Sequence, residues 1–243
     1  MIGVDLYKSI IFRLYSLLFY QKKSKAIFYH DIHSDERYTE MSTSIKLFIN
    51  HINIIRERGY DIVSNISKPN KQVEISFDDG FFGIYQNRDL IRHLDIPVQL
   101  FVVSSYIGKD NYINQQQLLK LNSLSQVTIS SHTNNHVDLT TVSKKRVKDE
   151  LQMSKKILEE ILNQKIDNVC FPYGRFNYQI VEIAKNVGYT NIYSSLPGFY
   201  FDRHSLGVTN RSLVQHASKQ DFYSILKGGD HILFRWYKRK HFR

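Results

Sequence analysis

Residues 73–80 read Val-Glu-Ile-Ser-Phe-Asp-Asp-Gly, a short strand followed at once by two carboxylates and a glycine. Adjacent carboxylates at the end of a strand repel each other unless a positive group lies beside them. A divalent metal ion would meet this need if one aspartate bound the ion and the other held a water molecule against it. The alternative is an ordinary turn, because Asp-Gly is common at turns. The two residues in question are Asp78 and Asp79.

Strands of this kind alternate with helical segments on both sides of this stretch, throughout residues 26–226. Strands are predicted over 26–29, 73–77, 97–103, 127–130, 169–171 and 190–194, and helices over 42–58, 82–94, 115–121, 143–163, 178–187 and 218–226. The alternation predicts one α/β domain with parallel strands buried on both faces, either a barrel or a doubly wound sheet. In both folds, catalytic side chains lie where strands end and loops begin.

A second polar cluster follows the strand predicted at 127–130. His132 and His136 are four residues apart, which would place both imidazoles on one side of a helical turn and suit two ligands of one metal ion. Histidine is the commonest ligand of transition metals at neutral pH. A single histidine is more often an ordinary surface or core residue, so the pair indicates a metal site only in combination with other motifs.

A third cluster, Cys170-Phe171-Pro172-Tyr173-Gly174, follows the next short strand. Proline stiffens this turn and glycine permits close backbone approach, so a backbone N–H here could point at a developing oxyanion. The alternative is a plain strand-to-helix loop. Taken together, the clusters offer one aspartate and two histidines for a metal, a second aspartate as base, and an oxyanion donor. That set indicates metal-assisted hydrolysis of an acyl group.

The three motifs resemble, in order and approximate spacing, those of the NodB-type polysaccharide deacetylases (carbohydrate esterase family four). Phe28-Tyr29-His30 looks like the family's opening strand, and the resemblance covers about residues 26–226. It implies an α/β fold, a distorted (β/α) barrel of seven strands. It also implies one divalent metal ion, most often Zn²⁺ with Co²⁺, Fe²⁺ or Ni²⁺ as alternatives. The implied reaction removes an N-acetyl group from an amino sugar of a bacterial surface polysaccharide or its precursor.

The resemblance also implies roles for the motif residues. Asp79, His132 and His136 would bind the metal. Asp78 would be the general base that activates a metal-bound water, and the backbone N–H of Tyr173 would stabilise the oxyanion.

Other residues are candidates for bracing and for substrate contact. Thr133 would brace the histidine loop, and His30, at the end of the first strand, would lie at the periphery of the site. Pro172 shapes the oxyanion turn, and Phe82 offers an aromatic face of the kind that suits a sugar ring. His204 is the candidate general acid, because it follows an aromatic loop that could approach the site.

Two features depart from the family pattern. Cys170 stands where the family often has an arginine that pairs with the catalytic base, so Asp78 must be oriented by other groups. The late Leu-x-His motif that usually supplies the general acid has no clear match, which leaves His216 and His231 as alternatives to His204. These departures keep open a catalytically impaired member that binds glycan or acts as a scaffold. A deacylase for an N-formyl or O-acetyl sugar is a further alternative.

The net charge of +10 belongs mainly to the two ends of the chain. Residues 1–25 contain five basic side chains against one acidic, and residues 227–243 contain six against one. This distribution argues against a nucleic-acid-binding face on the fold. The single cysteine, Cys170, excludes an internal disulfide and a cysteine-based zinc finger.

The segment at 1–25 predicts an amphipathic helix, which Arg13 makes too polar to cross a membrane. It lacks the clean apolar centre and cleavage site of a secretory signal. The helix either lies on an anionic membrane surface or packs on the domain's own core. We divide the chain into this helix, a catalytic domain over 26–226 and a basic, aromatic tail over 227–243 that is disordered in isolation. We expect a cytoplasmic protein, peripheral on the inner face of the cell membrane, that acts on an N-acetylated glycan or a lipid-linked precursor.

Overall fold

A computed structural model describes residues 2–19, 21–202 and 206–241 of the chain. Its main sheet is parallel throughout, in the order β10-β1-β5-β6-β7-β8-β9, with β4 paired to β5. The strands are β1 (Lys25–Tyr29), β4 (Asp61–Ile62), β5 (Gln72–Phe77), β6 (Val98–Val102), β7 (Val127–Ser131), β8 (Asn168–Cys170), β9 (Asn191–Tyr193) and β10 (Ser212–Leu213). The short strands β2 (Asp31–His33) and β3 (Ser42–Ser44) form a separate pair.

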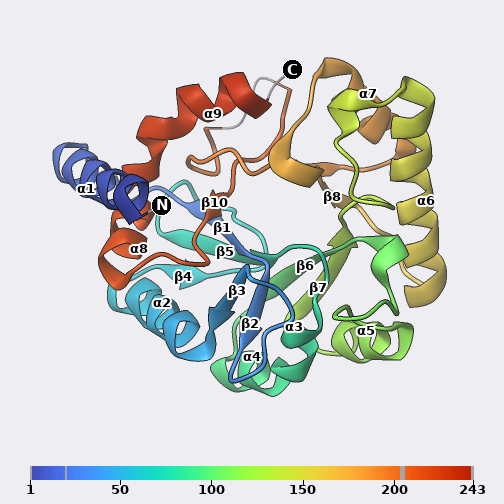
Figure 1. Ribbon diagram of the computed structural model, residues 1–243, viewed down its shortest axis with the longest axis horizontal. Helices are drawn as coiled ribbons and strands as arrows, with labels where there is room; N and C mark the ends of the chain where they lie inside the picture. The colour runs from blue at the N-terminus through green and yellow to red at the C-terminus, as the bar shows by residue number, and fades with distance from the viewer. Residues whose placement is uncertain (1, 20, 203–205, 242–243) are drawn as a thin grey trace.

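Helices cover the outside of this curled sheet (Figure 1). They are α1 (Ile2–Leu18), α2 (Ile45–Glu57), α3 (Phe82–Gln86), α4 (Arg88–Leu94), α5 (Gln115–Asn122), α6 (Lys144–Leu162), α7 (Tyr178–Val187), α8 (Lys219–Leu226) and α9 (Phe234–His241). Every residue of β1, β5 and β6 is buried, as expected for parallel strands covered on both faces. The predicted distorted (β/α) barrel is confirmed.

One segment, 209–213, lies between the two edges of the curled sheet. Thr209 forms a parallel bridge with Tyr193 of β9, and Ser212 pairs with Ile27 of β1. Val214 continues the connection, since its N–H donates to the carbonyl of Phe28 at 3.1 Å. The side chain of Arg211, in the middle of this segment, is completely buried inside the barrel.

Helix ends follow local sequence rules. The side chain of Asn177 caps α7 by accepting the N–H of Ile180, and Gly188 ends that helix with a φ of 100°. The helix predicted over 82–94 is two helices, a correction that Asn87 explains. Its backbone leaves the helical region, with φ −103° and ψ 20°, and its side-chain amide donates to the carbonyls of Gly83 and Ile32.

The described part of the C-terminal tail, 227–241, is ordered, which corrects the expected disordered end. It continues from the 3₁₀ helix η4 (Gly229–Leu233) into α9, and Tyr237 packs against the apolar core. An aromatic ring that reaches the core offsets part of the entropy lost on ordering a terminal helix.

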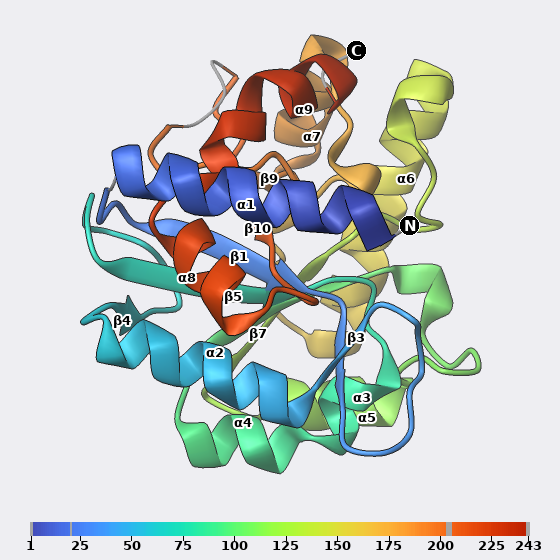
Figure 2. The ribbon, with the colours of Figure 1, turned by 60° about the vertical axis from the view of Figure 1, so that its left-hand side comes forward.

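The N-terminal helix α1 packs against α8 and η4, and Figure 2 shows it lying across α8. Ser9 and Arg13 both bond to a carboxylate oxygen of Asp221 on α8, at 2.5 and 3.0 Å, and Ser16 is buried. The helix therefore does pack on the domain, but in the orientation opposite to that of an ordinary amphipathic helix. Most of its large apolar side chains point to solvent: Tyr7, Ile10, Ile11, Leu14, Leu17 and Leu18. Among the described helices, none is long and apolar enough to cross a membrane.

Candidate active site

The three sequence clusters meet at one cleft, where the carboxyl ends of the parallel strands converge. The cleft is lined by Phe28, His30, Met41, Asp78, Asp79, His132, His136, Phe171, Tyr173, Gly174, Ser195, Arg211 and Leu213. Parallel strands bring their carboxyl ends to the same edge, so residues distant in sequence become neighbours there.

The three predicted metal ligands lie close together. The Oδ1 atom of Asp79 is 3.5 Å from Nε2 of His132 and 3.4 Å from Nε2 of His136, and all three atoms lie within 4.8 Å of one another. Ligand atoms about 2.0–2.1 Å from a tetrahedral zinc ion are separated by about 3.3 Å. Asp79 Oδ1 is buried and has no hydrogen-bond partner among the described residues. Both observations fit a divalent cation at this position.

The tautomer of His132 suits a metal ligand. Its Nδ1 lies 2.8 Å from the carbonyl oxygen of Cys170, which can only accept, so Nδ1 holds the proton. The Nε2 lone pair therefore faces Asp79, as in metal sites where a second group orients the imidazole. Burial lowers the pKa of His132 to about 3, so the ring is neutral at physiological pH. Burial and the nearby Asp78 charge raise the pKa of Asp79 to about 7, a cost that a bound cation would remove.

The histidine segment is a loop and not a helical turn, which corrects the expected geometry. Thr133 and His136 have positive φ angles of 66° and 54°, so left-handed residues, not helical spacing, turn both imidazoles toward Asp79. The hydroxyl of Thr133 has no hydrogen-bond partner in the described part of the chain. Its main chain fixes the loop instead, because its carbonyl accepts the N–H of Ser104 at 3.2 Å.

A buried carboxylate on α6, which sequence reasoning missed, holds the same loop. Glu150 accepts hydrogen bonds from the N–H groups of Asn134 and Asn135 at 3.1 and 2.7 Å, and from the Asn135 side chain at 2.8 Å. Arg146, one turn earlier on the helix, pairs with it at 2.7 Å. The available signal was its position, because Glu150 is the seventh residue of α6 and shares a helix face with Val147 and Leu151, where an acidic residue needs partners.

Arg211 pairs with the predicted base and is the main functional residue that sequence reasoning missed. Its Nη1 and Nη2 atoms each donate to one carboxylate oxygen of Asp78, both at 2.7 Å. Nε donates to the carbonyl of Ser194 at 3.1 Å, and Nη2 also approaches Cys170 Sγ at 2.7 Å. The rings of Phe28 and Phe101 lie 4.5 and 4.8 Å from the guanidinium carbon.

This arrangement compensates for the cysteine at position 170. Arg211 reaches Asp78 from the segment that joins the two edges of the sheet, while Cys170 is a small buried neighbour beside the guanidinium. Burial alone would raise the pKa of Asp78, but the charge and hydrogen bonds of Arg211 outweigh it, and the net shift is downward. Asp78 is therefore a carboxylate at neutral pH, as a general base must be.

Tyr173 supplies a main-chain donor at the rim of the cleft. It lies in the 3₁₀ turn η3 (Pro172–Gly174) with φ 59° and ψ 5°. The N–H groups of Gly174 and Arg175 donate to carbonyls within this turn, whereas that of Tyr173 has no acceptor among the described residues. The Tyr173 ring lies 4.8 Å from the ring of His136, which places this residue beside the proposed metal ligands. Pro172 is buried and does not line the cleft.

The remaining candidates divide between the cleft and other places. His30 lines the cleft, and its Nδ1 lies 2.5 Å from Oε1 of Gln215, so Nδ1 donates and Nε2 is left for other partners. Phe82 packs edge-on against Tyr38, with ring centroids 5.0 Å apart, and is not among the cleft-lining residues. The predicted general acid His204 lies outside the described residues.

The two alternative histidines do not line this cleft. His231 stacks between Phe199 and Phe234, with ring centroids 5.8 and 5.4 Å away. His216 lines a neighbouring hollow below α1. Of the imidazoles in the described chain, His30 is the one that the cleft contains besides the proposed metal ligands.

Comparison with known proteins agrees with this geometry. YxkH, a Bacillus subtilis protein named for polysaccharide deacetylases, is 24% identical over 187 residues, 72% of this chain and 66% of its own length. The poly-beta-1,6-N-acetyl-D-glucosamine N-deacetylase of Staphylococcus aureus is 24% identical over 134 residues. That match covers 49% of this chain and 46% of the relative. This chain thus spans from about half to just under two thirds of the length of these curated relatives.

Solved structures share the fold. The Streptococcus pyogenes deacetylase PplD, in complex with acetate, superposes with a TM-score of 0.74 at 22% identity, covering 84% of this chain and 98% of that one. IcaB from Ammonifex degensii gives a TM-score of 0.74 at 18% identity, covering 86% and 98%. The family model described as polysaccharide deacetylase matches residues 65–192, more than half of the chain. The chain belongs to the polysaccharide deacetylase family.

Proposed function

We propose that this protein is a metal-dependent deacetylase that removes N-acetyl groups from an amino sugar of a surface polysaccharide or its precursor. The observation that supports it best is the juxtaposition of Asp79, His132 and His136 with a second carboxylate, Asp78, that is held ionised by a buried arginine. A pocket used only for binding would not need an ionised base beside a set of metal ligands.

The chemistry follows from the positions of these groups. A divalent cation held by the three ligands would supply Lewis acidity at the acetyl carbonyl and lower the pKa of a water molecule, and Zn²⁺ suits the Asp-His-His donor set best. Asp78 accepts a proton from the attacking water, with Arg211 fixing both carboxylate oxygens. The N–H of Tyr173 donates to the oxygen that gains negative charge as the carbonyl carbon becomes tetrahedral.

Collapse of that tetrahedral species breaks the C–N bond and releases acetate, and the departing amine needs a proton. His30 is placed to donate it, because its Nδ1 is engaged by Gln215 and its ring lies in the cleft with Asp78. Burial lowers the pKa of His30, although the Asp78 charge opposes this shift, so Nε2 is unprotonated at neutral pH. His30 therefore acts as a relay: Nε2 takes up the proton that Asp78 accepts from the water and passes it to the departing amine. His204 remains the competing candidate from the sequence.

The family relationship supports an N-acetylated sugar as substrate. One relative is named for deacetylation of poly-beta-1,6-N-acetyl-D-glucosamine, so oligomers of that polymer are the first substrates to test. An N-formyl or O-acetyl sugar would use the same metal ligands, base and oxyanion donor, since these groups act on the acyl carbonyl and not on the sugar.

We also propose that α1 attaches the enzyme to an anionic membrane surface on the cytoplasmic side. Leu17 and Leu18 are 70% and 76% exposed, and Leu14 is 57% exposed, on a helix whose polar side is already bonded to the domain. The exposed Lys8 on the same helix and the basic α9 would favour anionic headgroups. Sedimentation with phosphatidylglycerol vesicles tests this: a Leu14→Ser/Leu17→Ser/Leu18→Ser variant should stay in the supernatant, and unchanged binding of that variant would contradict the proposal.

The deacetylase itself is tested by acetate release from N-acetylglucosamine oligomers linked β-1,6. Activity should disappear on chelation, return with Zn²⁺ or Co²⁺, and be absent from Asp78→Asn. Metal-loaded enzyme that binds the oligomers without releasing acetate would favour a binding role. If the enzyme releases only formate from N-formyl analogues, or only acetate from O-acetyl analogues, the acyl group that it removes is not the N-acetyl group.

A further inference from the structure

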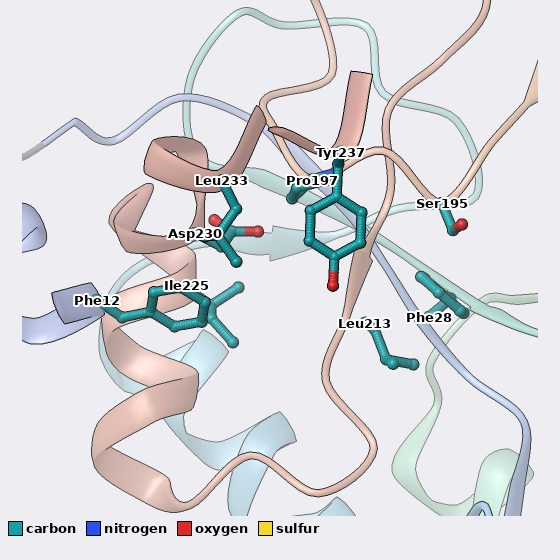
Figure 3. A pocket seen from close by; sticks show the side chains of 9 residues that line it. All are labelled: Phe12, Phe28, Ser195, Pro197, Leu213, Ile225, Asp230, Leu233 and Tyr237. Carbon is teal, nitrogen blue, oxygen red and sulfur yellow. The ribbon is translucent and has the colours of Figure 1, made fainter. Parts of the chain in front are cut away.

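A second, apolar pocket lies beside the active-site cleft, beneath the helices at the two ends of the chain (Figure 3). Its lining includes Phe12 of α1, Leu213 of β10, Ile225 of α8, Leu233 of η4 and Tyr237 of α9. Its volume is about 130 Å³, and its mouth is open to solvent.

The one charged residue in the lining does not make the pocket polar. Asp230 is buried, and one of its carboxylate oxygens pairs with Nζ of the buried Lys25 at 2.7 Å. Its other oxygen accepts from the hydroxyl of Ser212 at 2.5 Å. With both oxygens bonded, Asp230 has little need of a polar ligand, so the space favours an apolar one.

The pocket and the cleft adjoin each other. Phe28, Ser195 and Leu213 line both, so a molecule whose acyl group lies at Asp79 could extend past Leu213 into the apolar space. The two hollows would thus receive two chemically different parts of one molecule, a sugar and an apolar chain.

We propose that this pocket binds the lipid chain of a lipid-linked amino sugar while the sugar occupies the catalytic cleft. This inference rests on the proposed deacetylase function and names the class of its substrate: a saccharide joined, through an anionic phosphate linkage, to a long hydrocarbon chain. Leu213 would lie at the junction between sugar and lipid.

Charge and exposure around the pocket suit that occupant. One of its walls, α9, carries four basic residues and no acidic one (Arg235, Lys238, Arg239 and Lys240), which suits a phosphate linkage to the sugar. The solvent side of α1 is apolar, and Trp236 on α9 is 57% exposed, so the rim of the pocket resembles a surface that contacts lipid. A lipid chain could therefore enter from a membrane without crossing water.

The test compares two glycosides of N-acetylglucosamine that differ only in their apolar part, a dodecyl and a methyl glycoside, below the micelle concentration of the former. Wild-type enzyme should show a kcat/KM at least tenfold higher for the dodecyl glycoside, since each buried methylene group adds to the affinity. Leu233→Trp, which fills the pocket, and Phe12→Asp, which places a carboxylate in its wall, should bring that ratio close to one. Leu119→Trp, at a leucine on α5 that lines neither hollow, is the control and should keep the wild-type ratio.

Calorimetric binding to Asp78→Asn separates this inference from the deacetylase proposal, because it needs no turnover. The dodecyl glycoside should bind that variant at least tenfold more tightly than the methyl glycoside, and adding Leu233→Trp should abolish the difference. Equal affinity for the two glycosides, or a preference that survives both Leu233→Trp and Phe12→Asp, would overturn the lipid pocket. Lipid-dependent binding without acetate release from either glycoside would instead overturn the proposed function and leave the pocket standing.

Discussion

Replacement of Arg211 by methionine is the most informative perturbation of the site. The substitution keeps a long side chain between the rings of Phe28 and Phe101 but removes both donors to Asp78. Breaking a buried ion pair by removing one partner costs about 3–5 kcal/mol, because the remaining charge is left buried and unpaired. Asp78 avoids most of that cost by taking up a proton.

The consequence for catalysis follows from this protonation. Without Arg211, the effect of burial on the pKa of Asp78 is no longer outweighed, and the pKa rises. A protonated carboxyl cannot accept a proton from water, so kcat should fall about 10²- to 10⁴-fold near pH 7, the usual contribution of a general base. The loss should shrink as the pH is raised, because Asp78 ionises again.

The assay is acetate release from N-acetylglucosamine oligomers between pH 6 and 9, with bound metal quantified in each sample. Arg211→Met should retain its metal, since the guanidinium touches none of the three ligands directly. The exchange variant Arg211→Cys/Cys170→Arg supplies a sharper control, because Cys170 Sγ lies 2.7 Å from Arg211 Nη2 and an arginine at 170 starts next to Asp78. The kcat of this exchange variant should be at least tenfold higher than that of Arg211→Met.

A fully active Arg211→Met enzyme with the wild-type pH profile would refute the pairing. So would a variant that loses activity equally at every pH while folded and metal-loaded, because the defect would then not come from the protonation of Asp78. If Arg211→Met fails to fold, the exchange variant still decides whether an arginine beside Asp78 is what catalysis requires.

Three further predictions concern the loop, the general acid and the pH dependence of stability. Glu150→Gln should weaken metal affinity about 10- to 100-fold in a chelator competition, because an amide NH2 cannot accept from the Asn135 side chain or pair with Arg146 while the amide oxygen binds the loop; unchanged affinity would contradict its role. His30→Ala should reduce kcat on N-acetylglucosamine oligomers much more than His204→Ala does. A larger loss in His204→Ala would indicate that His204, and not His30, protonates the departing amine. His51 is buried, both of its ring nitrogens are hydrogen-bonded, and burial lowers its pKa to about 4 from 6.5. Protons therefore bind preferentially to the unfolded chain. Between pH 7 and pH 4.5, the free energy of unfolding in urea should fall by about 2–3 kcal/mol more for wild type than for His51→Gln. Equal losses in the two proteins would argue against a neutral buried imidazole.

Much of the fold could be predicted because its strands are buried and largely apolar and several of its helices begin with ordinary side-chain caps. The strand at Val73–Phe77 is buried at every residue, and Asn177 and Gly188 bound α7 as expected. The two-residue strand β10 escaped prediction because its pairing depends on distant residues and not on a local pattern. The division of 82–94 into two helices occurs at Asn87, whose backbone is not helical and whose side chain bonds to the distant carbonyl of Ile32.

The site was predictable where a motif is local and not where a partner is distant. Asp78 and Asp79 are adjacent in sequence, and His132 and His136 are close, so their chemistry could be inferred. Arg211 is 133 residues from Asp78, and nothing in its immediate sequence indicates a buried guanidinium. The orientation of α1 was hidden for a related reason, since the bonds of Ser9 and Arg13 reach Asp221 across more than 200 residues.

Metal stoichiometry tests the central claim most directly, because the site chemistry depends on a cation held by Asp79, His132 and His136. Native mass spectrometry of purified protein, after reconstitution with Zn²⁺, should show one ion per chain. The ion should be retained in Asp78→Asn and lost in Asp79→Ala and in His132→Ala, with all variants folded. A wild-type chain that takes up no ion, or a His132→Ala chain that holds it as tightly as wild type, would contradict the account.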